Sequence, residues 1–381
     1  MRITIRIWLA LTTIALMSAS GMAAAHKASD SFLYLNSGPT ELRMDVALRD
    51  LALLVSIDSN GDNEISGQEL RQARPEITRT IESALTFSNS SGNCGLAGKT
   101  WGISEHSDGV YSAARYAIRC PDDEPPEALE YDLLFGQDAL HRGLVSLDYN
   151  GQTRLAVLGP DSRTLDLADK DTPSYFSVFK TFVYEGVIHL LIGLDHILFL
   201  LVLIIPATLS THKDLTHGVQ SKALRGRLLE LTGIVTAFTV AHSITLALAA
   251  LDIVSLPIAW VETVIALSIG LAALNVAWPV LGHKTWKLAF GFGLVHGFGF
   301  ASVLGDLTSG VSDLAVALAG FNLGVELGQL ALLLVGFPVL FYLGKNRLYQ
   351  KGAVPLMLAG IGATSLFWVV QRALRTGARA G

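Results

Sequence analysis

Six apolar stretches in the second half of the chain constrain its fold more than any other feature. They lie near residues 182–205, 229–251, 256–281, 286–305, 314–343 and 353–371. A helix needs about 20 apolar residues to cross the hydrocarbon core of a bilayer. The sequence therefore predicts a polytopic α-helical membrane domain over residues 181–371, followed by a short basic tail at 372–381.

The loops between these stretches predict their orientation. Lys and Arg are concentrated in loops 206–227, 282–287 and 344–351, and the alternate loops carry none. Basic loops belong in the cytoplasm, which places the N-terminal part of the chain outside. Six spans also leave the tail outside, although it carries three arginines; the alternative is that 314–343 is a broken helix or two segments.

The first 25 residues predict a secretory signal peptide, because a basic start precedes a short apolar run and an Ala-rich end. An uncleaved anchor is the alternative. Residues 26–180 would then form an extracytoplasmic, periplasmic domain of a protein in the bacterial cytoplasmic (inner) membrane. Only 16% of the 381 residues are charged and the net charge is −5, which excludes the basic footprint of a nucleic-acid-binding protein.

The exported domain is predicted to be β-rich. Alternating runs bounded by turn residues predict strands at SFLYLNS, ELRMDVAL, GVYSAARYAIRC, LEYDLLF, LVSLDYN and TRLAVLG. A helical pair at 46–57 and 67–84 interrupts them. Cys94 and Cys120 are the two cysteines of the chain, and cysteines in an oxidising compartment usually pair; two buried free thiols are the alternative.

The helical pair flanks a loop, residues 58–69, that matches the calcium-binding loop of an EF-hand. Its oxygen ligands would be Asp58, Asn60, Asp62, the Glu64 carbonyl, Ser66 through water, and Glu69. Asn63 stands where glycine is usual, so we expect weakened calcium binding. A solvated acidic turn is the alternative.

Ionisable and polar side chains within the predicted spans mark a candidate site for a transition-metal ion, because such groups in hydrocarbon are costly and usually functional. These residues are Glu185, His189, Asp195, His196, His242, Glu262, His296, Asn322 and Glu326. Imidazole and carboxylate donors suit nickel, cobalt or zinc. Hydrogen-bonded packing is the alternative for each histidine taken alone.

Spacing along the helices predicts how these groups act together. Glu185 and His189 are four residues apart on one helix face and would form the entry. His189 and His196 would stand about 10 Å apart along a continuous helix, as successive binding positions. Asp195 and His196 would then need His242, His296 or Glu326 from neighbouring helices. Gly293 and Gly297 should let a neighbouring helix approach closely.

These segments, EGVIHLLIGLDHILFLL, AHSITLALA, VETVIALSIGLAALN and FGLVHGFGFASVL, resemble the HupE/UreJ family of bacterial membrane proteins. The resemblance covers most of residues 180–370 and implies a secondary transporter for nickel or cobalt, associated with hydrogenase and urease systems. It assigns His189, Asp195 and His196 to the family's histidine-and-aspartate signature, His242 and Glu262 to the next spans, and His296 to its HG segment. An exported domain with an EF-hand-like loop is similar to that of a subgroup of the family.

The sequence thus leads to the hypothesis of a permease for a divalent transition-metal ion, nickel ahead of cobalt, with a calcium-binding exported domain. Nickel-enzyme maturation systems are its partners by resemblance. The sequence has no GxxxxGK[ST] loop for ATP. One alternative is an intramembrane zinc hydrolase that uses the same histidines. Another is a sensor or docking module anchored by the spans.

Overall fold

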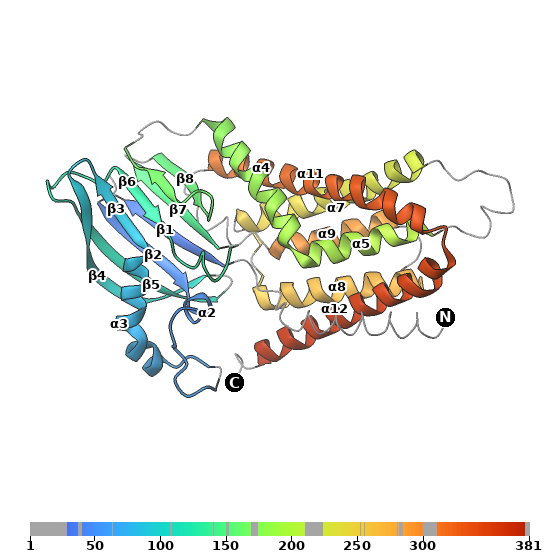
Figure 1. The fold of residues 1–381 in the computed structure, drawn as a ribbon, viewed down its shortest axis with the longest axis horizontal. Helices are drawn as coiled ribbons and strands as arrows, with labels where there is room; N and C mark the ends of the chain where they lie inside the picture. The colour runs from blue at the N-terminus through green and yellow to red at the C-terminus, as the bar shows by residue number, and fades with distance from the viewer. Residues whose placement is uncertain are drawn as a thin grey trace.

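The chain folds into a β domain followed by a bundle of apolar helices (Figure 1). The computed structural model describes residues 29–36, 40–62, 64–106, 109–139, 141–149, 152–168, 174–209, 224–251, 253–254, 256–279, 281, 285–299 and 311–377. The predicted signal peptide lies outside the described residues, as does the end of the basic tail.

Within the described ranges, the β domain contains nine strands in one sheet. They are β1 (Asp30–Asn36), β2 (Glu41–Ala47), β3 (Leu85–Asn89), β4 (Gly92–His106), β5 (Gly109–Arg119), β6 (Ala128–Tyr131), β7 (Arg142–Tyr149), β8 (Gln152–Leu158) and β9 (Thr164–Asp166). The order is β8-β7-β1-β2-β5-β4-β3-β6-β9, and only β1 and β7 pair in parallel. The sheet curls so that Arg154 of edge strand β8 donates to the Asp166 carbonyl of β9, 3.2 Å away.

Alternation along the strands buries both faces of this sheet. Leu33 and Leu35 of β1 join the larger core, together with Ile77 and Ile81 of α3 (Gly67–Ser83). Phe32, the residue before Leu33, packs on the opposite face with Tyr111 and Leu144. Since successive side chains of a strand point to opposite faces, this pattern fixes the register of the sheet. A disulfide joins Cys94 of β4 to Cys120, the residue after β5.

The predicted helix at 46–57 is wrong. Residues 41–47 pair with β5 as strand β2, and only Leu48–Leu51 form a short helix, α2. Turns follow, with the Leu53 side chain 54% exposed. The apolar run at 46–57 had suggested a helix, but Met44 and Val46 enter the core from a strand. The second predicted helix is present as α3. Strands β3, β4 and β9 were missed, and β4 contains several glycines and exposed residues that hide the alternation.

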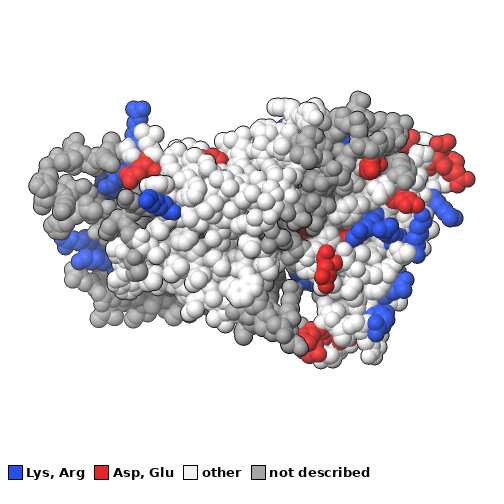
Figure 2. Space-filling model, turned by 180° about the vertical axis from the view of Figure 1, so that it is seen from behind, with Lys and Arg blue, Asp and Glu red and all other residues white. Residues whose placement is uncertain are grey.

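The bundle corresponds to the predicted membrane domain. Its helices are α4 (Tyr175–Ile192), α5 (Leu194–Thr208), α7 (Leu224–Ala250), α8 (Ile258–Ala277), α9 (Thr285–His296), the 3₁₀ turn η2 (Gly297–Gly299), α11 (Val311–Leu343), the π-helical turn η3 (Tyr349–Ala353) and α12 (Val354–Gly377). Among described residues, five helices are long and apolar enough to cross a membrane, and Leu194–Thr208 is a shorter apolar helix. Figure 2 shows the surface of the bundle as a largely uncharged band, with charged side chains towards its ends.

Two predicted spans differ from continuous helices. The first is divided at Gly193 into α4 and α5, and the fourth is described as a helix only to His296, followed by η2. The predicted span at 314–343 is one continuous helix, α11, so the broken-helix alternative is wrong. The end of α12 lies on the side of the β domain (Figure 1), where Arg372 pairs with Glu262 near the beginning of α8, 3.6 Å apart.

Glycines bring the helices into backbone contact. A Cβ added at Gly186 of α4 would lie 2.1 Å from the carbonyl oxygen of Phe321 in α11, and one at Gly297 would lie 2.3 Å from the carbonyl oxygen of His242 in α7. Gly293 likewise meets the Phe238 carbonyl of α7. The predicted close approach of a helix at Gly293 and Gly297 is therefore confirmed, and small residues drive such contacts within a membrane.

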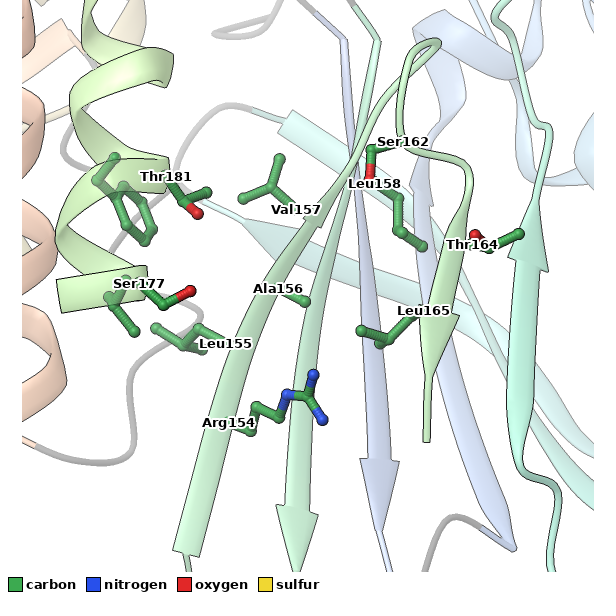
Figure 3. Close-up of a pocket in the computed structure, with 12 residues that line it drawn as sticks. Arg154, Leu155, Ala156, Val157, Leu158, Ser162, Thr164, Leu165, Ser177 and Thr181 are labelled. Carbon is green, nitrogen blue, oxygen red and sulfur yellow. The ribbon is translucent and has the colours of Figure 1, made fainter. Parts of the chain in front are cut away.

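The β domain meets the bundle at α4. Figure 3 shows Ser177 and Thr181 of α4 facing the edge strand β8, whose Leu155 and Val157 side chains lie on the side of α4. Nearby, Nε of Arg142 at the start of β7 lies 3.4 Å from Oε2 of Glu185 in α4. This junction sets the β domain directly over the first membrane helix.

Candidate metal site

The break at Gly193 creates the central feature of the candidate site. Gly193 adopts φ −64° and ψ 93°, an extended conformation that ends α4 and starts α5. The change of direction brings the His189 and His196 rings to 5.0 Å between centroids. The predicted separation of about 10 Å is wrong, because it assumed one continuous helix axis. The two histidines are neighbours in one place and not successive positions along a path.

Two further histidines reach the same place from other helices. The His296 ring at the end of α9 lies 5.6 Å from that of His196, and the His242 ring of α7 lies 6.2 Å from it. His196, His242 and His296 are all buried. The prediction that Asp195 and His196 meet His242 and His296 therefore holds for the three rings.

Aromatic side chains enclose these imidazoles. Phe238 of α7 lies 5.3 Å from the His296 ring and 6.0 Å from the His242 ring, and Phe199 of α5 lies 5.5 Å from His296. Phe321 of α11 lies 5.2 Å from His189. Sequence reasoning missed these phenylalanines, since apolar residues in a span carry no signal of a site. Their effect is to keep water from the imidazole nitrogens.

Several of those nitrogens have no hydrogen-bond partner among the described residues. His196 Nδ1 lies 3.1 Å from Asp195 Oδ1, and Ser268 Oγ lies 3.1 Å from His296 Nε2. The remaining ring nitrogens, His196 Nε2, His296 Nδ1 and both of His242, are buried and unpartnered. Buried polar atoms are normally satisfied, and leaving one without a partner costs free energy. Because a neutral imidazole has one lone-pair nitrogen, these three rings offer up to three donor nitrogens, one from each, to a ligand.

The imidazole and carboxylate side chains lie close together, but they do not point at one common position for a metal ion. No group of three His, Cys, Asp or Glu side chains in the described parts of the chain is disposed to hold one metal ion. The rings meet edge to face, with interplanar angles of 69°, 73° and 78° around His196. Binding one ion would require rotation of the imidazoles about their side-chain bonds.

The comparison with known families agrees with this arrangement. A family model described as HupE / UreJ protein matches residues 167–372, more than half of the chain. The chain belongs to the HupE/UreJ family. No curated protein is significantly similar to it. Membership in the HupE/UreJ family suggests a membrane protein related to nickel or cobalt transport, and the match begins at the end of the β domain.

Two other predicted membrane residues of this HupE/UreJ protein, Asn322 and Glu326, make hydrogen bonds within and between α7 and α11. Glu326 of α11 accepts a hydrogen bond from Thr236 of α7 at 2.6 Å, and Gln329 accepts one from Thr239 at 2.9 Å. Asn322 donates to the Leu318 carbonyl. These side chains form a second polar cluster between α7 and α11. The second carboxylate oxygen of Glu326 and the amide oxygen of Asn322 are buried without a partner among the described residues. The suggestion that Glu326 completes the shell around Asp195 and His196 stays a prediction.

The two remaining carboxylates of the predicted set face arginines. Glu185, predicted as an entry residue with His189, pairs with Arg142 of the β domain. Glu262 pairs with Arg372 of α12, which also donates to the Glu262 carbonyl at 2.6 Å. Arg142 was missed because it lies 43 residues from Glu185 in another domain, and no local spacing joins them.

The predicted calcium loop of the HupE/UreJ chain folds around Glu69. The Glu69 carboxylate accepts from the amides of Ser59 and Ser66, both at 3.0 Å, and forms a capping box with Ser66 at the start of α3. Hydrogen bonds from Ser66 and Ser59 lower the pKa of Glu69 to about 2. Asp58 accepts from the Gly61 amide at 2.7 Å. Asn63 lies outside the described residues. No helix adjoins the start of the loop, so the EF-hand-like helix–loop–helix is reduced to a loop and its exiting helix.

Proposed function

We propose that this protein is a permease that carries a divalent transition-metal ion across the bacterial cytoplasmic membrane, nickel ahead of cobalt. The observation that carries the proposal is the gathering of His189, His242 and His296 around His196, which contacts Asp195. His196, His242 and His296 have buried ring nitrogens without a partner among the described residues. Imidazole with carboxylate suits nickel and cobalt.

The broken first helix supports transport in particular. Substrate sites of secondary transporters are typically built where discontinuous helices end inside the membrane. Here the Gly193 amide donates to the His189 carbonyl, and Asp195 lies in the first turn of α5. The positive end of α5 favours the charged carboxylate, while α4 ends with carbonyl groups that face the same region. A cation would find carboxylate, imidazole and carbonyl donors together.

Nickel accumulation in cells tests the proposal. Cells expressing the wild type should accumulate nickel above cells without the protein, and His196→Gln should lose most of this uptake because it removes a central imidazole. Leu191→Ala is a matched control, since Leu191 is an exposed residue of α4. The amount of protein in the membrane is measured for each variant. Equal uptake by wild type and His196→Gln would overturn the permease.

Binding measurements on the purified protein separate the permease from its rival. Calorimetry in detergent with nickel, cobalt and zinc should give reversible binding that His242→Phe weakens. One zinc ion per chain that survives dialysis, together with hydrolysis of a lipid substrate, would favour an intramembrane zinc hydrolase. A site that holds its cargo so tightly would not release it.

We also propose that loop 58–69 binds calcium in the exported domain. Glu69 reaches across the loop from the third residue of α3, the position from which a bidentate glutamate completes an EF-hand loop. Calcium titration of the full chain in detergent should show binding that Glu69→Gln abolishes, because glutamine retains the capping box but lacks the charge. Glu76→Gln, on the exposed face of α3, is the control. Calcium binding unchanged in Glu69→Gln would contradict the proposal.

A further inference from the structure

Two segments of the membrane domain share a motif and a break. Gly186-Val187-Ile188-His189 of α4 corresponds to Gly293-Leu294-Val295-His296 of α9 under a shift of 107 residues. α4 ends three residues after His189, and α9 ends at His296 itself. Burial repeats under the same shift at the motif glycine and at two further positions, since Phe182, Gly186 and Leu190 are buried in the first segment and Ala289, Gly293 and Gly297 in the second.

The helices that follow these segments correspond as well. Phe238-Thr239-Val240-Ala241 of α7 matches Phe321-Asn322-Leu323-Gly324 of α11 under a shift of 83 residues. Burial repeats under the same shift: Leu231, Ile234, Val235, Phe238, Ala241, His242, Thr245 and Leu246 are buried in α7, and Leu314, Ala317, Leu318, Phe321, Gly324, Val325, Gly328 and Gln329 are buried in α11.

The third helices complete the pattern. Ile269-Gly270-Leu271-Ala272-Ala273-Leu274 of α8 matches Ile361-Gly362-Ala363-Thr364-Ser365-Leu366 of α12 under a shift of 92 residues. Four exposed positions coincide, with Val264, Leu267, Leu271 and Leu274 in α8 and Leu356, Ala359, Ala363 and Leu366 in α12. Helices α4, α7 and α8 therefore match α9, α11 and α12 in order, with α5 continuing the span that α4 begins.

The packing is reciprocal between the two sets. The first helix of each set packs on the second helix of the other, α4 on α11 and α9 on α7. Both contacts use the motif glycine against the matched phenylalanine: a Cβ on Gly186 would lie 2.1 Å from the Phe321 carbonyl oxygen, and one on Gly293 would lie 2.4 Å from that of Phe238. The third helices, α8 and α12, pack on each other. Reciprocal packing of this kind is expected when a two-fold rotation relates the two sets of helices.

We propose that the membrane domain consists of two three-helix repeats of opposite orientation, and that the metal site opens to the two sides of the membrane as the repeats exchange conformations. An odd number of spans inverts the second repeat, and inverted repeats with a central site are a recurring basis of alternating access. His189 and His296 are then equivalent ligands from the two repeats. The inference on alternating access rests on the proposed transport function; the repeat itself does not.

The repeats differ where the β domain meets them. Glu185 of the first repeat pairs with Arg142, whereas its counterpart in the second repeat is Phe292. The ion pair ties the first repeat to the β domain one helical turn from His189. During alternating access, the Arg142–Glu185 ion pair closes the outer side of the site. The pair must break when the inner side closes.

Thiol labelling tests the inversion without reference to transport. Lys180 and Lys287 are equivalent, exposed positions under the 107-residue shift. In intact spheroplasts, a membrane-impermeant maleimide should label Lys180→Cys, and should label Lys287→Cys only after permeabilisation. The unmodified chain is the control, since Cys94 and Cys120 are joined in a disulfide. Labelling of both positions from one side would overturn the inverted repeat.

Distances between spin labels test the exchange. Lys180→Cys with Leu251→Cys reports on the end of the bundle near the β domain, and the equivalent pair Lys287→Cys with Leu334→Cys reports on the far end; Leu251 and Leu334 are both exposed. Adding Arg142→Ala should lengthen the first distance and shorten the second. No change, or change in the same direction, would overturn the exchange. Opposite changes in a protein that moves no metal would instead overturn the proposed function and leave the repeat intact.

Discussion

Arg142 and Glu185 form an ion pair that joins the β domain to the first membrane helix. Nε of Arg142 lies 3.4 Å from Oε2 of Glu185, and the two side chains are 14% and 19% exposed. Arg142 also donates to the carbonyl of His141 at 3.0 Å and lies over Gly159, where a Cβ would be 3.4 Å from its Nε. The β domain thus holds a fixed cation against a carboxylate four residues from His189.

Removal of this cation should destabilise the protein. Arg142→Ala leaves the largely buried Glu185 carboxylate without its counter-charge, which should cost about 1–3 kcal/mol. Arg163→Ala is the control, because the Arg163–Asp132 pair is 44% and 57% exposed and such pairs contribute less than about 1 kcal/mol. Thermal unfolding of the full chain in detergent measures both. The double variant Arg142→Ala with Glu185→Gln should recover part of the loss. Equal melting temperatures for Arg142→Ala and Arg163→Ala would contradict a stabilising ion pair between Arg142 and Glu185.

Gly193→Ala should strongly reduce metal uptake. An added Cβ would lie 2.7 Å from His196 Nδ1 and 3.0 Å from Asp195 Oδ1, so the methyl group must separate the aspartate from the imidazole. We expect nickel accumulation to fall at least about tenfold, since losing one ligand contact of about 1.4 kcal/mol already changes an affinity by that factor. Gly360→Ala in α12, where an added Cβ meets nothing within 4 Å, is the control and should transport normally.

The sequence predicted the spans, most strands and the histidines, because hydropathy and alternation are local properties. It did not predict that His189 and His196 are neighbours, since that depends on the backbone at Gly193. The break could be anticipated only by recognising a glycine before an acidic first-turn residue within an apolar run. The partner of Glu326 could not be predicted for a different reason: a helix face can be calculated from spacing, but the helix opposite it cannot, and Glu326 of α11 accepts a hydrogen bond from Thr236 of α7.

His141 should make the β domain sensitive to acid. Burial, aided by the charge of Arg142 and opposed by that of Asp138, lowers the pKa of His141 to about 4. The Ser29 hydroxyl donates to Asp138 Oδ2, so it accepts from Nδ1 of His141 at 2.7 Å and leaves Nε2 as the acceptor for the Tyr131 hydroxyl. The neutral ring is therefore fully satisfied, and a second proton on Nε2 would displace the hydrogen bond that Tyr131 donates to it.

The sign of this effect follows from the direction of the shift. Because the pKa of His141 is lower in the folded than in the unfolded chain, the unfolded state takes up a proton as the pH falls from about 6.5 to about 4, and folding loses up to about 3 kcal/mol. Urea unfolding of the full chain, monitored by protease cleavage within residues 29–168, should show this loss of folding free energy as the pH falls. A His141→Gln variant should be less stable at neutral pH but should lack the slope in that window; an unchanged slope would refute the role of His141.

Two glycines of α11 provide a matched test of helix packing. A Cβ at Gly324 would lie 2.1 Å from the Val183 carbonyl oxygen and 3.0 Å from Gly186 Cα in α4, whereas a Cβ at Gly336 meets nothing within 4 Å. Gly324→Ala must push α4 and α11 apart, and we expect a loss of roughly 1–3 kcal/mol, as for other overpacked sites. Gly336→Ala should be neutral or stabilising by up to about 1 kcal/mol, because alanine favours a helix more than glycine does. Thermal unfolding in detergent compares the two variants in the same helix, and a smaller loss for Gly324→Ala than for Gly336→Ala would show that α4 and α11 do not pack through this glycine.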